Sequence, residues 1–328
     1  MLIYNGHQTQ SDLLVNIKIY NKYVFFFIIY PVIDYVYKYR NNLFKKLVKL
    51  FFFIFLLNVG ISILGMLLDS ELVRSYPFRD RFGYSGLIPK RNEATLFYML
   101  GVSVAYARLV IEGRKEKVLF FYSLFGALIL GTKGIYIFLI FLFFFHIRAN
   151  KKFLKNLLIV GFFGIVLGII VLPQTEMYSY YYSQAQRIGF FTMLLSGRDV
   201  IFYNEINNIV QNWNVFNVFV GGQNQNNKAF EMDFLDLFFF FGMIGSFLYI
   251  FLMRKHFFPG KQKTPFQNFF MFSYFFLAFF GGHFFASAVN GLYFTIVTIY
   301  IYKSGLIMHV RRTTEISYDN YINKKSLQ

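Results

Sequence analysis

The sequence predicts an all-α protein that crosses a membrane several times, as a single integral membrane domain over residues 1–328. Hydrophobic residues make up 56% of the chain and charged residues only 15%, whereas a soluble domain of this length carries more charge. Apolar runs long enough to cross a bilayer recur along the whole chain. Basic residues gather at every second connection between these runs. Together these observations define a polytopic helical membrane protein.

About nine segments of the chain are expected to cross the membrane as helices. They are residues 23–37, 47–68, 94–111, 118–131, 134–147, 157–172, 234–252, 267–285 and 287–302. Several are shorter than the roughly 20 residues of a typical span, so they either tilt little or extend beyond these bounds. The fourth and fifth meet at the tight turn GTKG, residues 131–134, where one long kinked helix is the alternative.

Clusters of Lys and Arg define the expected topology. They fall between spans one and two, three and four, five and six, and seven and eight, and again after span nine. Because connections rich in these residues stay in the cytoplasm, all these clusters and the C-terminus are placed there. The alternation also favours two separate spans at GTKG, since merging them would break it. The same rule accounts for the net charge of +17, so nucleic acid is not an expected partner.

The remaining connections are expected to face outward. They are residues 69–93, the turn at Lys133, the one large loop at 173–233 and the short segment ASAVNG. An odd number of spans also places the N-terminus outside, although Lys18 and Lys22 precede span one and oppose that orientation. Residues 69–93 are dense in cations, Arg79 and Arg81 among them. That density indicates either an anionic ligand or a salt-bridged lid.

Within the large loop, the stretch SGRDVIFYNEINNIVQNW has apolar residues at helical spacing and amides on the other face. It predicts an amphipathic helix that lies across the membrane surface or over the bundle. Ser196 followed by Asp199 is a capping-box pattern and predicts a start at Ser196. Arg198 opposes the helix dipole there. An anion at the helix start would explain this cation. The alternative is that Arg198 pairs with Asp199 or with lipid phosphates.

Other outward residues are candidates for chemistry, each with a simpler alternative. Glu231 and Asp233 lie at the mouth of span seven, where a carboxylate pair is usually a solvated helix start. Asp236 lies about one turn deeper, where burial is costly and a partner is needed. Lys133 is either a functional cation or a lysine whose ammonium reaches the headgroups. His283, after two glycines, is either a proton-transfer group or a packing residue.

Several kinds of chemistry are excluded by composition. The chain has no cysteine, so it has no disulfide, thiolate metal site or cysteine nucleophile. Its five histidines are scattered, and no acidic pair marks a metal site for a nucleotide sugar. No glycine-rich phosphate loop lies on the expected cytoplasmic side. No metal and no cofactor are therefore expected.

A set of short segments resembles the motifs of a known family. GTKGIYIFLIFLF is similar to a turn that opens a span, and SGRDVIFYNEINNIV followed by GGQ is similar to a large-loop signature. EMDFLDLFFFFGMIG resembles the segment after that loop, and RFGYSGLIPKRNEA and GGHFFASAVNGLYF resemble flanking external motifs. In this combination they resemble the bacterial O-antigen and capsular polysaccharide polymerases of the Wzy type, in the O-antigen ligase superfamily. The resemblance covers about residues 79–300.

This resemblance implies a glycosyltransferase related in fold to the all-helical class C type. Such enzymes polymerise oligosaccharide repeat units linked to undecaprenyl pyrophosphate, on the outer face of the bacterial cytoplasmic membrane. The implied partners are the lipid-linked donor and acceptor glycans, membrane lipid and a chain-length regulator protein. The family usually has more than nine spans, and a further N-terminal span outside this sequence would explain the difference.

The resemblance also implies roles for individual residues. Pyrophosphate is the leaving group, so cations must receive its charge as the bond breaks. By position in the motifs, Arg198 and Lys133 are expected to bind it, with Arg81 and Arg79 behind them. His283 and Glu231 are both candidates to deprotonate the acceptor hydroxyl. Asp233 and Asp236 are expected to orient the site, and no metal is required.

Two rival functions share the same substrates. An O-antigen ligase would transfer finished chains, but ligases typically carry a histidine motif in the large loop, and residues 173–233 contain no histidine. A flippase or transporter for lipid-linked saccharides is the other rival. The long outward loop favours chemistry, and the sequence shows none of the internal repeats typical of transporters.

Overall fold

The computed structural model describes residues 10–76, 81–112, 116–149, 176–222, 230–260 and 263–302. In these ranges the fold is all-helical, as the sequence predicts, with no β-strand and one isolated antiparallel bridge between Arg74 and Tyr84. The expected span at 157–172 lies outside the described residues.

The main bundle is formed by long apolar helices. They are α1 (Gln10–Tyr39), α2 (Asn41–Leu67), α3 (Arg91–Glu112), α4 (Lys117–Ile129), α5 (Lys133–Ala149), α11 (Asp233–Phe257), α12 (Pro265–Phe280) and the helix Ala288–Tyr302. A short 3-10 helix, η1 (Glu71–Val73), lies between α2 and α3. Helices therefore occur at eight of the expected positions, but α1 and α2 begin well before the expected spans 23–37 and 47–68.

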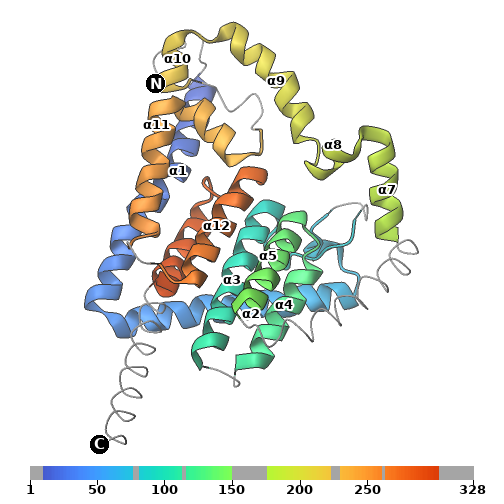
Figure 1. Cartoon of the computed structure of the whole chain (residues 1–328), viewed down its shortest axis with the longest axis vertical. Coiled ribbons are helices and arrows are strands. Elements are labelled where there is room, and N and C mark those ends of the chain that lie inside the picture. The colour runs from blue at the N-terminus through green and yellow to red at the C-terminus, as the bar shows by residue number, and fades with distance from the viewer. Residues whose placement is uncertain are drawn as a thin grey trace, which may run out of the picture.

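The expected large loop is mostly helical where it is described. It contains α7 (Glu176–Ile188), α8 (Phe190–Leu194), α9 (Arg198–Asn212) and α10 (Val215–Val220), which we call the arm. Figure 1 shows the arm arching around one side of the molecule, from the region of α5 to the upper end of α11. The apolar face of α9 packs with Phe230 and with Phe239 of α11.

By length and composition, three of the described helices could each cross a membrane. They are α2, residues Arg91–Val110 of α3, and α11, with mean hydropathies of 2.5, 1.2 and 2.0. Shorter apolar helices are α4, α12 and Ala288–Tyr302. This composition is compatible with a membrane protein.

The GTKG turn separates two helices, as the alternation of charges predicts. α4 ends at Ile129 and α5 begins at Lys133, so the alternative of one long kinked helix is wrong. Gly131 has a φ of +73°, and a Cβ there would meet the backbone carbonyl of Phe82. Glycine is therefore required at this position by both conformation and close approach.

The expected single span at 234–252 is interrupted. Gly242 inside α11 has a φ of 70° and a ψ of −177°, which breaks the helix into two pieces. Gly221 and Gly222, which follow α10, lie against this break. A Cβ on Gly221 would lie 2.6 Å from the Gly242 nitrogen, and the Gly222 N–H donates to the Phe239 carbonyl at 3.2 Å. The two glycine sites thus let the arm dock backbone to backbone on α11.

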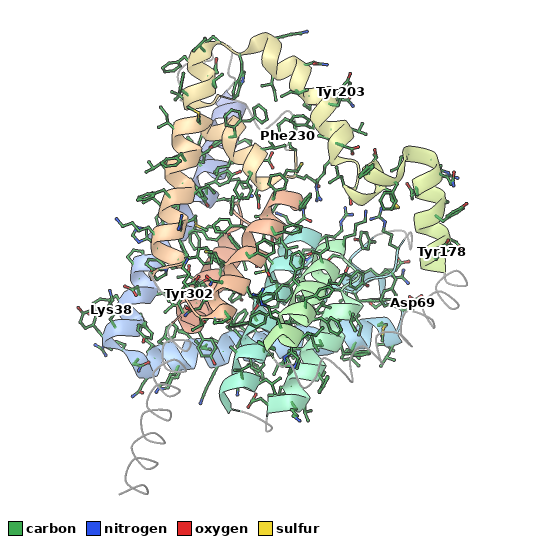
Figure 2. The ribbon with its side chains drawn as sticks, in the orientation of Figure 1. Lys38, Asp69, Tyr178, Tyr203, Phe230 and Tyr302 are labelled. Atoms are coloured by element: carbon green, nitrogen blue, oxygen red, sulfur yellow. The ribbon has the colours of Figure 1, made fainter. Side chains whose placement is uncertain are left out.

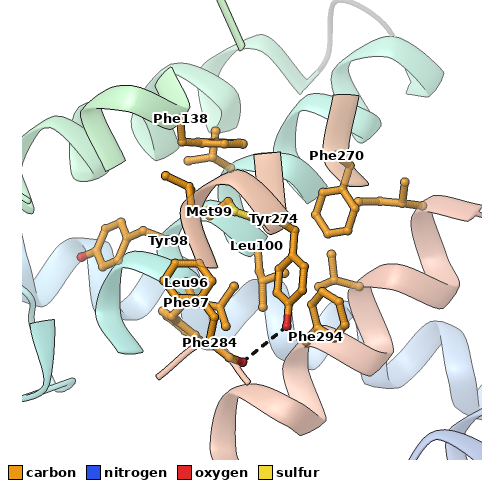
Figure 3. Close-up of a cluster of buried hydrophobic side chains, with 14 of the residues drawn as sticks. Leu96, Phe97, Tyr98, Met99, Leu100, Phe138, Phe270, Tyr274, Phe284 and Phe294 are labelled. Carbon is orange, nitrogen blue, oxygen red and sulfur yellow. Dashed lines mark hydrogen bonds between the residues drawn. The ribbon is translucent and has the colours of Figure 1, made fainter. Parts of the chain in front are cut away.

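The core is centred on α3, whose apolar residues are almost all buried. Figure 3 shows rings from α3, α5 and α12 packed with Phe284 and Phe294. The ring centroids of Tyr274 and Phe294 are 4.3 Å apart, and the Tyr274 hydroxyl donates to the Phe284 carbonyl at 3.4 Å. This contact holds the segment that follows α12, where α12 ends at Phe280 rather than at residue 285 as expected.

Candidate functional site

The start of α9 differs from the predicted capping box. α9 begins at Arg198, after Gly197 in the left-handed region with a φ of 79°, and no side chain caps it. Ser196 also has a positive φ, of 58°. The carboxylate of Asp199 accepts instead from the Thr192 hydroxyl at 2.5 Å. The prediction that Ser196 and Asp199 form a capping box is therefore wrong.

Arg198 reaches from the start of α9 to the end of another helix. Its Nη1 donates to the backbone carbonyl of Phe280 at 2.6 Å, and its Nη2 lies 3.5 Å from Oε2 of Glu231. Phe280 is the last residue of α12, where backbone carbonyls lack helical partners and carry partial negative charge. The guanidinium thus opposes the dipole of its own helix but complements that of α12. Its Nε is buried with no hydrogen-bond partner in the described part of the chain.

Lys133 makes a comparable contact to α8. Its ammonium donates to the Met193 carbonyl, near the end of α8, and to the Ser196 hydroxyl at 3.1 Å. Lys133 precedes the expected span 134–147. Burial, together with the neighbouring Arg81 and Arg198, lowers the pKa of Lys133 to about 8. The structure therefore gathers these cations from separate parts of the chain.

Arg81 is held by an aromatic ring. Its guanidinium carbon lies 5.2 Å from the ring centroid of the buried Tyr76, and that of Arg91 lies 5.1 Å from the same centroid. Contacts of this type favour a cation at the ring face. Arg81, in the 69–93 connection, thus lies near Lys133. Arg79 lies outside the described residues.

Asp233 organises the segment between α12 and the helix Ala288–Tyr302. Its side chain is 1% exposed and accepts backbone N–H groups from His283 at 2.7 Å, Phe284 at 2.7 Å and Phe285 at 3.2 Å. A carboxylate that accepts several backbone donors is strongly held. Asp233 therefore holds the backbone at His283, and its orienting role in the site stays a prediction.

His283 and Glu231 come together through a close backbone approach. A Cβ on Gly282, which lies between them, would meet the backbone of Glu231 at 2.8 Å. Glu231 and His283 have φ values of 56° and 71°. Non-glycine residues rarely adopt this region, and they are enriched where a functional geometry is maintained. Ser196 at the arm adds a third such residue to the same neighbourhood.

Burial lowers the pKa of His283, while the carboxylates of Glu231 and Glu93 oppose that shift. Lys90 and Lys22 lower it further. The imidazole is therefore neutral near pH 7 and retains a nitrogen lone pair that can accept a proton. The groups that shift the pKa of His283 are also the charges that lie around it.

Sequence reasoning did not include three of these charges in the site. Lys22 of α1, Lys90 and Glu93 surround His283, and burial followed by Lys90 lowers the pKa of Lys22. The amide of Asn290 donates to the Glu93 carbonyl at 2.9 Å and joins the start of α3 to the segment after His283. The sequence contained one signal for Lys22. A lysine just before span one is unexpected on the outward side of the membrane, where the topology places it.

Asp236 is slightly less buried than Asp233, contrary to the expectation that it lies deeper, and it supports the same region. It is 5% exposed, and its Oδ1 accepts from the Phe230 N–H at 2.7 Å. It thereby fixes the chain just before Glu231. Both aspartates therefore act on backbone groups that carry the candidate chemical residues.

We call the assembled group the charged site. It consists of Lys22, Arg81, Lys90, Glu93, Lys133, Arg198, Glu231 and His283, supported by Asp233 and Asp236. Its cations outnumber its carboxylates, so it is suited to receive an anion. Among the described residues, no group of three or more His, Asp or Glu side chains could hold a metal ion.

No protein-family model matches the chain, and no curated protein or solved structure is significantly similar to it. Support for a function therefore comes from the geometry of the charged site and from the resemblance of the sequence segments.

Proposed function

We propose that this protein is a glycosyltransferase that polymerises repeat units linked to undecaprenyl pyrophosphate, in the bacterial cytoplasmic membrane. The observation that carries the proposal is the convergence of Arg81, Lys133 and Arg198 beside Glu231 and His283. These residues are far apart in the sequence, and each belongs to one of the segments that resemble the polymerase motifs.

The proposed chemistry uses the cations to bind the leaving group. The acceptor hydroxyl attacks the anomeric carbon of the donor, and the bond from that carbon to the pyrophosphate oxygen breaks. The bonding electrons leave with the pyrophosphate, whose charge Arg198 and Lys133 stabilise. The buried Nε of Arg198 supports this role because, among the described residues, this donor has no acceptor.

The proton of the acceptor hydroxyl needs a base. We assign this role to His283, since burial keeps its imidazole neutral. Glu231 remains the other candidate, but its carboxylate is paired with the guanidinium of Arg198 at 3.5 Å. Asp233 and Asp236 hold the backbone on which both candidates are carried.

The function is tested in a strain that lacks the gene. We expect single repeat units to accumulate on the lipid carrier at the outer face, with no long chains, and plasmid-borne wild-type protein to restore the chains. Loss of all outward-facing repeat units would instead identify a flippase. Long chains that form but stay on the carrier would identify a ligase. Purified protein in liposomes, given only lipid-linked repeat units, is expected to produce polymer and free undecaprenyl pyrophosphate.

The lowered pKa of Lys133 predicts a loss of activity at alkaline pH. With a pKa of about 8, it loses its charge as the pH rises from neutrality, whereas an ordinary lysine stays charged to about 10.4. We therefore expect kcat/KM for the lipid-linked substrate to fall above about pH 8, because this ratio reports ionisation of the free enzyme. Lys133→Arg keeps its charge throughout and is expected to remove this alkaline fall.

The exposed Lys117 at the start of α4 provides the matched control. Lys117→Arg should leave the pH profile of the wild type unchanged. An alkaline fall of the same size and position in Lys133→Arg would contradict the assignment of Lys133 to the anion.

A further inference from the structure

A second basic site lies at the other end of α12 from the charged site. α12 has 16 residues, so Pro265 and Phe280 at its ends are about 24 Å apart, near the thickness of a bilayer core. Arg198 binds the Phe280 end. Figure 2 labels Phe230, just before Glu231, in the upper part of the molecule and Lys38 lower on the left. The two basic sites lie at opposite ends of α12.

The Pro265 end carries a pocket of about 770 Å³ between the last turns of α11 and the first turns of α12. Its polar lining is basic and amide-containing, with Arg254, Lys255, Lys263 and Asn268. No carboxylate is among the described residues that line it. A pocket with several cations and no acid favours an anionic ligand.

The ammonium of Lys263 donates to a weak hydrogen-bond acceptor in this pocket. The acceptor is the Met271 thioether, at 3.2 Å, and a thioether is a weak acceptor. Burial lowers the pKa of Lys263, and the nearby Arg254 lowers it further. The preference of Lys and Arg for cytoplasmic connections explains why basic residues occur at this end. It does not explain why the half-buried ammonium of Lys263 faces a thioether and an arginine.

The remaining lining is apolar and favours a lipid over a free ion. Phe251, Phe258 and Met271 line the pocket beside the cations, and Phe251 is 49% exposed. Phosphate oxygens would replace the thioether at Lys263, while the apolar rings would contact the first methylenes of acyl chains. We propose that this pocket binds the phosphate headgroup of an anionic phospholipid in the leaflet opposite the charged site.

This proposal does not depend on the enzymatic function. It is tested with the purified full chain in neutral detergent, by adding phosphatidylglycerol, phosphatidylcholine or inorganic phosphate and following retained lipid by native mass spectrometry and thermal stability. We expect phosphatidylglycerol to be retained and to stabilise the protein. Arg254→Gln with Lys263→Gln should weaken its binding about 25-fold, since each cation near an anionic lipid contributes about fivefold.

The matched control removes two exposed cations at the start of α2, outside this pocket, as Lys45→Gln with Lys46→Gln. It should change binding by less than about twofold. Lys263→Arg keeps the charge and should bind nearly as well as the wild type, and it tests the site even if the double variant folds poorly. Equal retention of phosphatidylcholine, equal stabilisation by inorganic phosphate, or an equal loss in the control would each overturn the proposal.

Discussion

Arg198→Lys is expected to reduce the rate of polymer formation by about 100-fold, the typical cost of one lost donor to a developing anion. Lysine keeps the positive charge but lacks the planar fork that contacts two groups at once. In this protein the fork reaches both the Phe280 carbonyl and Glu231, and the buried Nε has no partner in the part of the chain that the structure describes. A single ammonium cannot satisfy the α12 terminus and also face a pyrophosphate. The measurement is the rate of chain elongation in reconstituted liposomes.

Arg187→Lys is the control for this variant. Arg187 lies exposed in α7 of the same arm, so the same substitution there should leave the rate unchanged. Protein level and thermal stability need to match in both variants. Polymer of full length formed at the normal rate by Arg198→Lys, at normal protein level, would remove Arg198 from the site.

The positions of the bundle helices could be predicted from sequence because apolar runs and alternating basic clusters are local signals. The separation of α4 from α5 followed from the charges on either side of GTKG. The break at Gly242 could not be predicted in this way. It depends on backbone contact with Gly221 across a turn that is distant in sequence, and the run around it is uniformly apolar.

The sequence identified several candidate site residues, but not Lys22, Lys90 and Glu93, and not the arrangement of the site. Arg198 appeared to conflict with its own helix dipole, and that conflict correctly marked it as unusual. Its partner at Phe280 is 82 residues away, and no local pattern indicates that contact. The capping box failed because Ser196 and Gly197 adopt left-handed conformations that let Ser196 meet Lys133. Local capping preferences were overridden by these contacts between the arm and the bundle.

Asp233→Asn is expected to lower the free energy of unfolding by about 3 kcal/mol, because buried backbone donors lose acceptors. The carboxylate uses both oxygens to accept the N–H groups of His283, Phe284 and Phe285. An amide has one oxygen, so its NH₂ group must face at least one of these donors. Unfolding of the purified protein, followed by heat or denaturant, measures the loss.

Asp34→Asn is the matched control, because Asp34 pairs with Lys38, whose side chain is 57% exposed. It should cost less than about 1 kcal/mol, the usual limit for an exposed ion pair. Activity per folded molecule separates a structural role from a positioning one. If Asp233 orients His283 as we infer, the folded fraction of Asp233→Asn should also elongate chains more slowly than the folded wild type. Wild-type activity in that fraction would show that the left-handed geometry at His283 persists without the carboxylate, and the positioning role of Asp233 would then be wrong.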